Sequence, residues 1–303
     1  MKVAITGATG FLGRYLVERM IALDNECRCW HRPTSDRSGF EYADGRLEWC
    51  EGALGDEDSC HRLVAGCDAV IHSGLHRTGA AFRGGEGDLS VFVQKNVLGT
   101  VQLIDAARNA GADRFVFIST CSVHEKLLDD RPLDEAHPLW AITHYGAHKA
   151  AVEQFVHSYG FGAGFNICAV RPTGIYGVAH VADNSKWYDL IRDVAEGREA
   201  QCRRGGKEVH ASDVALAVDL LLHADDIAGE VYSCYDRYVS EYDVAAIAKE
   251  ITGSTATIAG EQTRPKHQIV SDKIKALGMR FGGDELLRST IRQIADHVAF
   301  HAG

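Results

Sequence analysis

The chain has 303 residues, of which 46% are hydrophobic and 24% charged, as in a globular protein with a large core. Its formal net charge of −10 offers no positive surface for nucleic acid or anionic lipid, and no apolar run is long enough to span a bilayer. Nine cysteines without a Cys-x-x-Cys spacing indicate reduced thiols, and the start of the chain does not resemble a secretory signal. We therefore expect a cytoplasmic protein that has neither nucleic acid nor a membrane as a partner.

Short apolar runs alternate with helical patterns along the first part of the chain. Strands that alternate with helices form βαβ units, and such units assemble into a parallel sheet with ligands at the carboxyl ends of the strands. The sequence therefore predicts the α/β class, with a Rossmann-type doubly wound parallel sheet and a small C-terminal substrate-facing lobe. The strands are expected at residues 2–6, 27–30, 47–50, 68–72, 114–119 and 165–170.

Beyond Gly177 the pattern becomes irregular, although residues 207–210 and 230–234 look like further strands. Helical spacing reappears over residues 213–224 and 284–300. We predict a dinucleotide-binding Rossmann domain over residues 1–177, to which residues 208–235 return. The smaller substrate-binding lobe would consist of residues 178–207 and 236–303.

A glycine-rich turn follows the first strand and precedes a helix. Gly7 suits a tight turn, Gly10 lets the backbone approach a pyrophosphate, and Gly13 lets the helix pack closely on the strand. The N-terminus of the helix offers free N–H groups and a partial positive charge to phosphates. A tight turn without a ligand is the alternative. The predicted dinucleotide contacts in this loop are Gly7, Thr9, Gly10, Phe11, Leu12 and Gly13.

The end of the second strand lacks the carboxylate that binds the adenosine ribose of NAD, since the chain reads Trp30-His31-Arg32-Pro33. Arg32 could instead accommodate the 2′-phosphate of NADP, with Arg37 as a second contact. A solvated surface arginine is the alternative. The sequence thus favours NADP and leaves NAD open.

Tyr145 and Lys149 are four residues apart, which places a phenol and an ammonium on one face of a helix. A free tyrosine titrates near 10, and a neighbouring lysine cation favours the phenolate and so lowers that pKa. The phenol can then exchange a proton with a substrate hydroxyl while hydride moves to or from a nicotinamide. Thr120, just after the fifth strand, can orient the same substrate oxygen.

With these motifs in place, the sequence resembles the extended short-chain dehydrogenase/reductases, often grouped as NAD-dependent epimerase/dehydratases, over nearly its whole length. The matching segments are Thr6-Gly7-x-x-Gly10-x-x-Gly13, Asn96-Val97-x-Gly99-Thr100, Phe117-Ile118-Ser119-Thr120-x-x-Val123, Tyr145-x-x-x-Lys149, Arg171-Pro172-Thr173-Gly174-Ile175-Tyr176-Gly177 and Val209-His210-x-x-Asp213-Val214-Ala215.

The resemblance implies roles for individual residues. It implies a catalytic triad of Thr120, Tyr145 and Lys149, with Asn96 supporting the architecture of the active site. It also implies a homodimer, formed through the helices around residues 91–110 and 140–159. The cofactor neighbours that it adds are Ser73, Gly74, Pro172 and Thr173.

Four departures from the family pattern reduce the number of family reactions that we expect for this chain. Relatives often have an adenine-contacting aspartate where this chain has Ala53, so Leu54 and the backbone are what remain for the adenine. Sugar-nucleotide dehydratases of the family place an acidic pair where this chain has Cys121 and Ser122, and neither side chain is a good general acid at neutral pH.

The other two departures affect the substrate side. Many relatives read Val-Tyr-Gly where this chain has Val123-His124-Glu125. Enzymes that act on nucleotide sugars often have an asparagine that helps hold the substrate diphosphate where this chain has Gly174. Gly174 is typical of reductases in the family whose substrates lack a diphosphate.

Fifteen histidines raise the question of a metal. The pairs His72/His76 and His144/His148 have helical spacing but no His-Glu-x-x-His context, so we predict no metal site. His124 and His144 are either substrate contacts or ordinary solvated or core residues. The aromatic residues Trp140, Trp187 and Tyr188 are likewise either pocket residues or ordinary core and surface residues. The basic cluster Arg203, Arg204 and Lys207 is either a solvated loop or a contact for an anionic substrate group.

The prediction is an NAD(P)-dependent oxidoreductase that interconverts a hydroxyl and a carbonyl on a small molecule, sugar-like compounds included. One alternative is an NAD-dependent sugar epimerase with a tightly held cofactor. An alternative of another class is a non-catalytic regulator that senses NADP.

Overall fold

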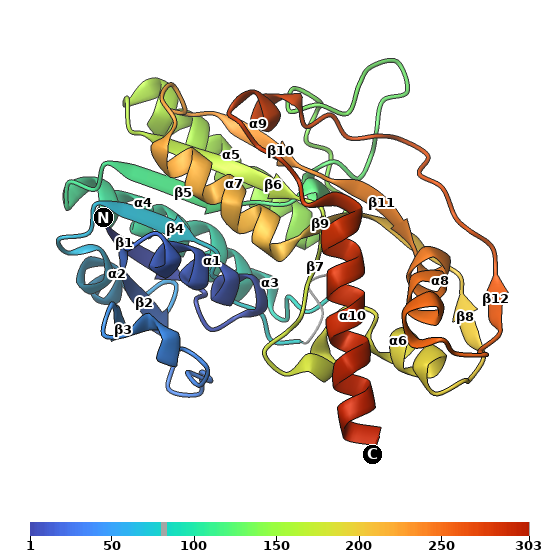
Figure 1. The fold of residues 1–303 in the computed structure, drawn as a ribbon. Coiled ribbons are helices and arrows are strands. Elements are labelled where there is room, and N and C mark those ends of the chain that lie inside the picture. The colour runs from blue at the N-terminus through green and yellow to red at the C-terminus, as the bar shows by residue number, and fades with distance from the viewer. Residues whose placement is uncertain (80–83, 303) are drawn as a thin grey trace. The chain divides into compact units, whose positions relative to one another are not determined.

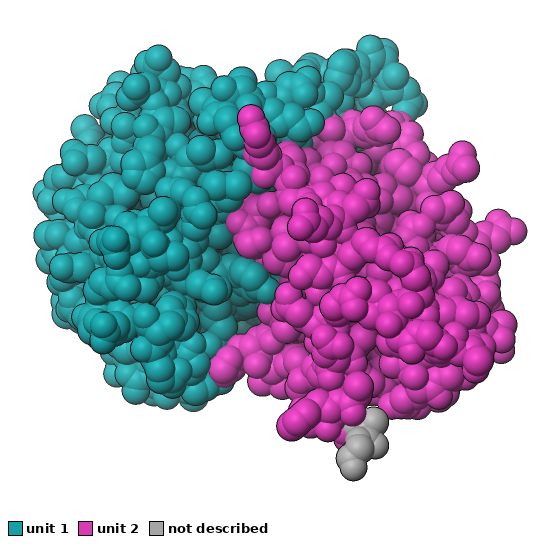
Figure 2. All heavy atoms as spheres, in the orientation of Figure 1, with its two compact units in different colours: residues 1–172, 215–234, 270–279 teal, residues 173–214, 235–269, 280–303 magenta. Residues whose placement is uncertain are grey.

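The structure is a computed structural model that describes residues 1–79 and 84–302, and it consists of two compact units. Unit 1 comprises residues 1–172, 215–234 and 270–279, and unit 2 comprises residues 173–214, 235–269 and 280–303 (Figure 2). This division differs from the expected one. Residues 173–177 and 208–214 join unit 2 because two of their strands pair with each other, and residues 270–279 join unit 1 because their helix packs against its edge strand.

Unit 1 is built on a sheet that has seven parallel strands in the described part of the chain (Figure 1). The strand order is β10-β6-β5-β4-β1-β2-β3, so the direction of winding reverses beside β1. In a doubly wound sheet the ligand crevice lies at this reversal, outside the carboxyl ends of the strands. The strands are β1 Lys2–Thr6, β2 Glu26–His31, β3 Leu47–Glu51, β4 Ala69–His72, β5 Arg114–Ile118, β6 Ile167–Pro172 and β10 Val231–Cys234. The predicted doubly wound sheet is confirmed.

Helices cover this sheet and connect its strands. They are α1 Phe11–Ala22, α2 Glu57–Val64, α3 Leu89–Val93, α4 Gly99–Asn109, α5 His144–His157, α7 Ala211–His223 and α9 Asp272–Ala276, with the short helical segments η1 Glu41–Ala43, η2 Gln94–Leu98, η3 Cys121–Val123 and η4 Ser158–Gly162. Leu63 of α2, Leu103 of α4 and Val152 of α5 share one buried cluster with Phe115 and Phe117 of β5. Burial of each such side chain contributes about 1.5–3 kcal/mol, which fixes α5 against the sheet.

Unit 2 contains two small sheets and its own core. One sheet has the order β11-β9-β7 and the other pairs β12 with β8. The elements are β7 Gly174–Tyr176, η5 Ala182–Asn184, α6 Tyr188–Ala195, β8 Ala200–Cys202, β9 Gly205–His210, β11 Arg237–Ser240, α8 Glu241–Thr252, β12 Ile258–Gly260 and α10 Gly283–Ala302. The irregular sequence pattern beyond Gly177 did not predict α6 and α8. A capping box formed by Ser240 and Asp243 marks the start of α8 and is the signal that could have found it.

All nine cysteines lie in the described residues and carry free thiols. Within residues 1–79 and 84–302, no helix combines the length and the apolar character needed to cross a membrane.

Candidate active site

The glycine-rich turn after β1 has the geometry that a phosphate site requires. Gly7 has a φ of +71°, and a Cβ there would lie 2.8 Å from Ser73 Oγ and 2.9 Å from the Gly74 nitrogen. A Cβ at Gly13 would clash with the Gly7 carbonyl. Gly10 precedes α1 without a side-chain cap, so the first N–H groups of the helix are left for an anion. The chain therefore fits a pyrophosphate at this turn.

A buried chain of hydrogen bonds ties this turn to the rest of unit 1. The Gly74 N–H donates to Thr6 Oγ1 (2.9 Å), which contacts His72 Nδ1 (2.6 Å), while His72 Nε2 contacts Thr100 Oγ1 (2.9 Å). Thr100 donates its only hydroxyl hydrogen to the Asn96 carbonyl, so His72 must donate from Nε2 and accept from Thr6 at Nδ1. Burial lowers the pKa of His72 to about 3, which keeps this ring neutral.

Asn96 extends this series of hydrogen bonds into the loop after β4. Its Nδ2 donates to the carbonyls of Phe92 and His76, and its Oδ1 accepts from the His76 N–H (2.8 Å). Asn96 is buried in η2, a π-helical turn between α3 and α4. Because its amide is engaged on both sides, Asn96 holds the loop next to Ser73 and Gly74.

Positive charge gathers beyond the end of β2. Arg32 is exposed directly after this strand. Burial lowers the pKa of His76, and the neighbouring cations Lys95 and Arg32 lower it further. Arg37 is also exposed. Leu54 packs into the core cluster of unit 1, so its side chain faces away from solvent.

Lys149 is buried in α5 at the carboxyl end of β5. Its ammonium donates to the Ile118 carbonyl (2.7 Å) and lies 4.5 Å from the centre of the Phe117 ring. Burial lowers the pKa of Lys149 to about 7, and the charge of Glu153 opposes this effect. Lys149 therefore keeps its positive charge less readily than an exposed lysine.

Tyr145 and Thr120 belong to two segments that touch each other. Tyr145 is half-buried in the first turn of α5, and a Cβ at Gly146 would clash with the Ser122 carbonyl, so only glycine allows this approach. Thr120 Oγ1 accepts the Ser122 N–H (3.1 Å), which ties the hydroxyl to the same short turn. The structure thus brings the Thr120, Tyr145 and Lys149 segments together at the end of β5.

Glu125, one of the departures from the family pattern, fastens the start of α5. One of its carboxylate oxygens accepts from the N–H groups of Ile142 (2.7 Å) and Thr143 (2.9 Å) and from Thr143 Oγ1 (2.9 Å). Thr143 Oγ1 in turn accepts the Gly146 N–H and caps the helix. Glu125 therefore sets the position of the helical turn that carries Tyr145.

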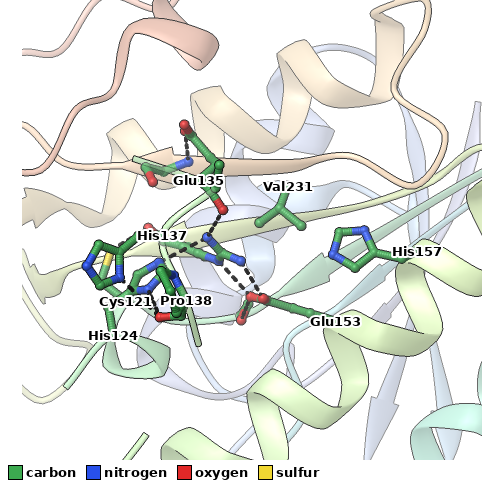
Figure 3. A network of polar contacts seen from close by, with 12 residues as sticks. Cys121, His124, Glu135, His137, Pro138, Glu153, His157 and Val231 are labelled. Carbon is green, nitrogen blue, oxygen red and sulfur yellow. Dashed lines mark hydrogen bonds and ion pairs between the residues drawn. The ribbon is translucent and has the colours of Figure 1, made fainter. Parts of the chain in front are cut away.

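A buried ion pair joins α5 to β6 (Figure 3). Arg171 donates from Nε and Nη2 to the two carboxylate oxygens of Glu153 (2.9 and 2.7 Å), and both side chains are within 2% of complete burial. Ser119 donates to the same carboxylate. Arg171 Nη1 reaches the Glu135 carbonyl (3.1 Å), and the Glu135 carboxylate accepts the N–H of Ser233 in β10. No sequence motif predicts this network, because its members are far apart in the chain.

His124 belongs to this network, and both of its ring nitrogens have partners. Its Nε2 accepts from Arg171 Nη1 (3.0 Å), so Nδ1 carries the hydrogen and donates to the Pro138 carbonyl (3.2 Å). Burial and the Arg171 charge lower the pKa of His124 to about 4. His144, the other histidine considered as a substrate contact, is exposed at the start of α5.

The remaining candidates lie in varied surroundings. Trp140 is exposed, and its ring lies 5.6 Å from the Lys126 ammonium. Arg203 and Arg204 are exposed, and their backbone N–H groups donate to the Glu241 carboxylate. Pro172 ends β6, and the hydroxyl oxygen of the next residue, Thr173, is buried without a hydrogen-bond partner. Such an oxygen is suited to bind a ligand or water.

Comparisons with known proteins identify the family of the chain. Residues 3–234 match the model of the NAD dependent epimerase/dehydratase family. The 4-hydroxy-2-methyl-3-oxo-4-farnesyl-3,4-dihydroquinoline-1-oxide ketoreductase of Stigmatella aurantiaca is 31% identical over 245 residues, which cover 78% of this chain and 68% of that protein. The UDP-glucose 4-epimerase of Rhizobium meliloti is 30% identical over 178 residues, which cover 56% of this chain and 53% of the epimerase, so the match spans about half of that relative.

Solved structures show the same fold. A dTDP-glucose 4,6-dehydratase from Streptomyces venezuelae with bound NAD gives a TM-score of 0.79 at 22% identity, with 99% of this chain and 98% of that chain covered. A UDP-glucose 4-epimerase from Thermus thermophilus in complex with NAD gives 0.77 at 22% identity, with 99% of each chain covered.

Replacement of Lys149 by Met should stabilise the protein and abolish activity. Between pH 7 and 10.5 the unfolded chain keeps the lysine proton that the folded chain releases, so the cost of burying the amine is greatest at and below pH 7 and disappears as the pH rises toward 10.5. Urea unfolding should show a gain of about 2–4 kcal/mol for Lys149→Met near neutral pH that shrinks toward about pH 10. A variant less stable than the wild type at neutral pH would contradict the conclusion that burial of the amine destabilises the fold.

Replacement of Glu125 by Ala should reduce kcat about 10- to 100-fold, because Tyr145 loses its fixed position, while cofactor affinity stays constant. The matched control is Asp243→Ala, since Asp243 also accepts three hydrogen bonds at the start of a helix, here from Ser240 and Gln262. Both variants should lose about 1 kcal/mol of unfolding free energy, and only Glu125→Ala should lose kcat. Glu125→Gln should recover part of the rate, and equal losses of kcat in the two Ala variants would refute the positioning role.

Proposed function

The chain belongs to the NAD-dependent epimerase/dehydratase family, and from this we propose that it is an NAD(P)-dependent reductase that interconverts a carbonyl and a hydroxyl group on a small molecule. The observation that supports the proposal is that the segments carrying Thr120, Tyr145 and Lys149 lie together at the carboxyl end of β5, in the unit whose glycine-rich turn offers an uncapped helix N-terminus. A bound nicotinamide cofactor would supply or accept hydride at this site.

The three side chains would divide the proton chemistry among them. Tyr145 donates its phenolic proton to the substrate oxygen during reduction and takes it back during oxidation. Lys149, held by the Ile118 carbonyl, favours the phenolate by its charge and binds the cofactor ribose. Thr120 Oγ1 accepts from the Ser122 N–H, which leaves its own hydrogen to donate to the substrate oxygen and so to orient it.

Reduction is favoured over dehydration by the residues after Thr120. Cys121 donates its thiol hydrogen to the Arg171 carbonyl (3.1 Å), and Ser122 packs against α5. Neither supplies the carboxylate pair that dehydration of a sugar requires. An epimerase that retains NAD would use the same triad. A reductase and an epimerase differ in cofactor use, because a reductase consumes NADPH stoichiometrically and an epimerase stays active without added cofactor.

The cofactor contacts that we propose are residues of unit 1 together with Thr173. Arg32 and Lys95, which both lower the pKa of His76, support NADP as the preferred cofactor. Leu54 would contribute its backbone alone, because its side chain packs into the core. The other proposed contacts are Gly7, Thr9, Gly10, Phe11, Leu12, Gly13, Ser73, Gly74, Tyr145, Lys149, Pro172 and Thr173.

We further propose a cytoplasmic homodimer. The nine free thiols favour a reducing compartment. Large apolar side chains are exposed along α3, η2 and α5 at Leu89, Val91, Val93, Leu98 and Phe155, and they offer a surface for a second copy.

Tyr145→Phe should lower kcat at least about 100-fold and leave the Kd for NADPH within about twofold, because it removes the proton donor and little else. The assay follows NADPH and NADH oxidation with a panel of aldehydes, ketones, keto-sugars and lactones. Activity that survives in Tyr145→Phe would overturn the proposed role. A wild type that consumes no cofactor with any of these compounds, and whose Tyr145→Phe variant differs only in partner binding, would indicate a regulator.

Arg32→Ala should raise the KM for NADPH about tenfold and leave the KM for NADH within about twofold, since only the 2′-phosphate loses a contact. Arg264→Ala removes another exposed arginine, outside unit 1, and serves as the charge-matched control. An equal effect of Arg32→Ala on both cofactors would argue against a 2′-phosphate contact.

A further inference from the structure

A buried carboxylate in unit 2 occupies space that two glycines leave open. Glu208 lies in β9, is 3% exposed and pairs in register with Gly174 of the neighbouring strand β7. A Cβ at Gly174 would lie 2.6 Å from Glu208 Oε2, and a Cβ at Gly206 would clash with Oε1. The carboxylate therefore lies across both glycine positions.

Lys186 neutralises this carboxylate and links it to an aromatic wall. The Lys186 ammonium pairs with Glu208 and lies 5.2 Å from the centre of the Trp187 ring. Trp187 has a φ of +67°, a left-handed backbone that is uncommon for a bulky residue and that clusters at functional sites. The ion pair thus lies between Trp187, whose backbone is strained, and the space left by the two glycines.

The wall behind the pair continues through Tyr176. The Trp187 ring lies 5.3 Å from that of Tyr176, which packs edge-on against His210 at 5.0 Å. The Tyr176 hydroxyl is buried without a hydrogen-bond partner. Tyr176 and His210 are buried, so these rings form the apolar core behind the pair and contribute no cation.

The covalent chain places this pair beside proposed cofactor contacts. Gly174 directly follows Thr173, whose buried hydroxyl lacks a partner, and comes two residues after Pro172. At Gly174 the family resemblance places the asparagine that holds the diphosphate of nucleotide-sugar substrates. Here a carboxylate stands at that position, and its one ion-pair partner among the described residues is Lys186.

A diphosphate brought to Gly174 would meet two costs. Its charge would repel Glu208, and it would have to draw Lys186 away from a buried carboxylate, which leaves that carboxylate unpaired. Specificity against a ligand commonly arises from such a repulsive element.

We propose, on the basis of the reductase function above, that the Glu208–Lys186 pair excludes nucleoside-diphosphate substrates and restricts the enzyme to carbonyl compounds without a phosphate group. This separates the chain from the nucleotide-sugar enzymes whose fold it shares.

The test is calorimetric titration of the NADP-loaded enzyme with UDP and with UDP-glucose. Burial raises the pKa of Glu208 to about 7, so the titration is done near pH 8, where the carboxylate is charged. The wild type should bind neither probe with a Kd below about 1 mM. Glu208→Gln should bind UDP at least about tenfold more tightly because Lys186 becomes free, and Glu208→Gln/Lys186→Ala should lose that gain.

The control is Asp193→Asn, which neutralises another ion-paired acid of unit 2, the partner of Arg198, and should leave UDP binding at the wild-type level. Micromolar binding of UDP by the wild type would overturn the proposal even if no variant folds. The proposal would also be overturned if Glu208→Gln bound UDP no more tightly than the wild type, or if Asp193→Asn gained as much affinity for UDP as Glu208→Gln. Failure of the wild type to bind or oxidise NADPH contradicts the proposed function instead, and it is measured separately in the same preparation.

Discussion

The buried ion pair between Arg171 and Glu153 is the interaction on which the arrangement of unit 1 depends. Two charges removed from water cost several kcal/mol each unless their hydrogen-bonding capacity is met. Here the carboxylate receives two bonds from the guanidinium and one from Ser119, while the guanidinium also reaches His124 and the Glu135 carbonyl. A network satisfied in this way is rigid, and it ties the ends of β5 and β6 to the middle of α5.

This rigidity reaches the residues that we propose for proton transfer by short paths. Glu153 lies one helical turn after Lys149 and opposes the effect of burial on its pKa. Ser119 immediately precedes Thr120, so the bond from Ser119 to Glu153 fixes the backbone from which the threonine hydroxyl projects. Glu125 fastens the start of α5, and Arg171 of β6 fastens its middle through Glu153. The helix is therefore held at two points around Tyr145 and Lys149.

The sequence predicted the features that depend on neighbouring residues. The strands of the parallel sheet and the turn at Gly7 follow from local hydrophobic pattern and from the need for positive φ, and the structure has both. The network around Arg171 escaped prediction because its partners are brought together only by the fold. Glu125 was visible merely as an unusual residue, since its role depends on a loop that returns to it at Ile142 and Thr143. His124 could be read as a substrate contact until both of its ring nitrogens were found to be engaged.

Every contact described for fastening Thr120, Tyr145 and Lys149 comes from unit 1, whereas the Glu208–Lys186 pair and its aromatic wall belong entirely to unit 2. Mutations in the second unit can thus accumulate without loosening the three residues that we propose for proton transfer. Over evolutionary time such a partition lets a lineage exchange one metabolite for another while its catalytic chemistry is inherited unchanged.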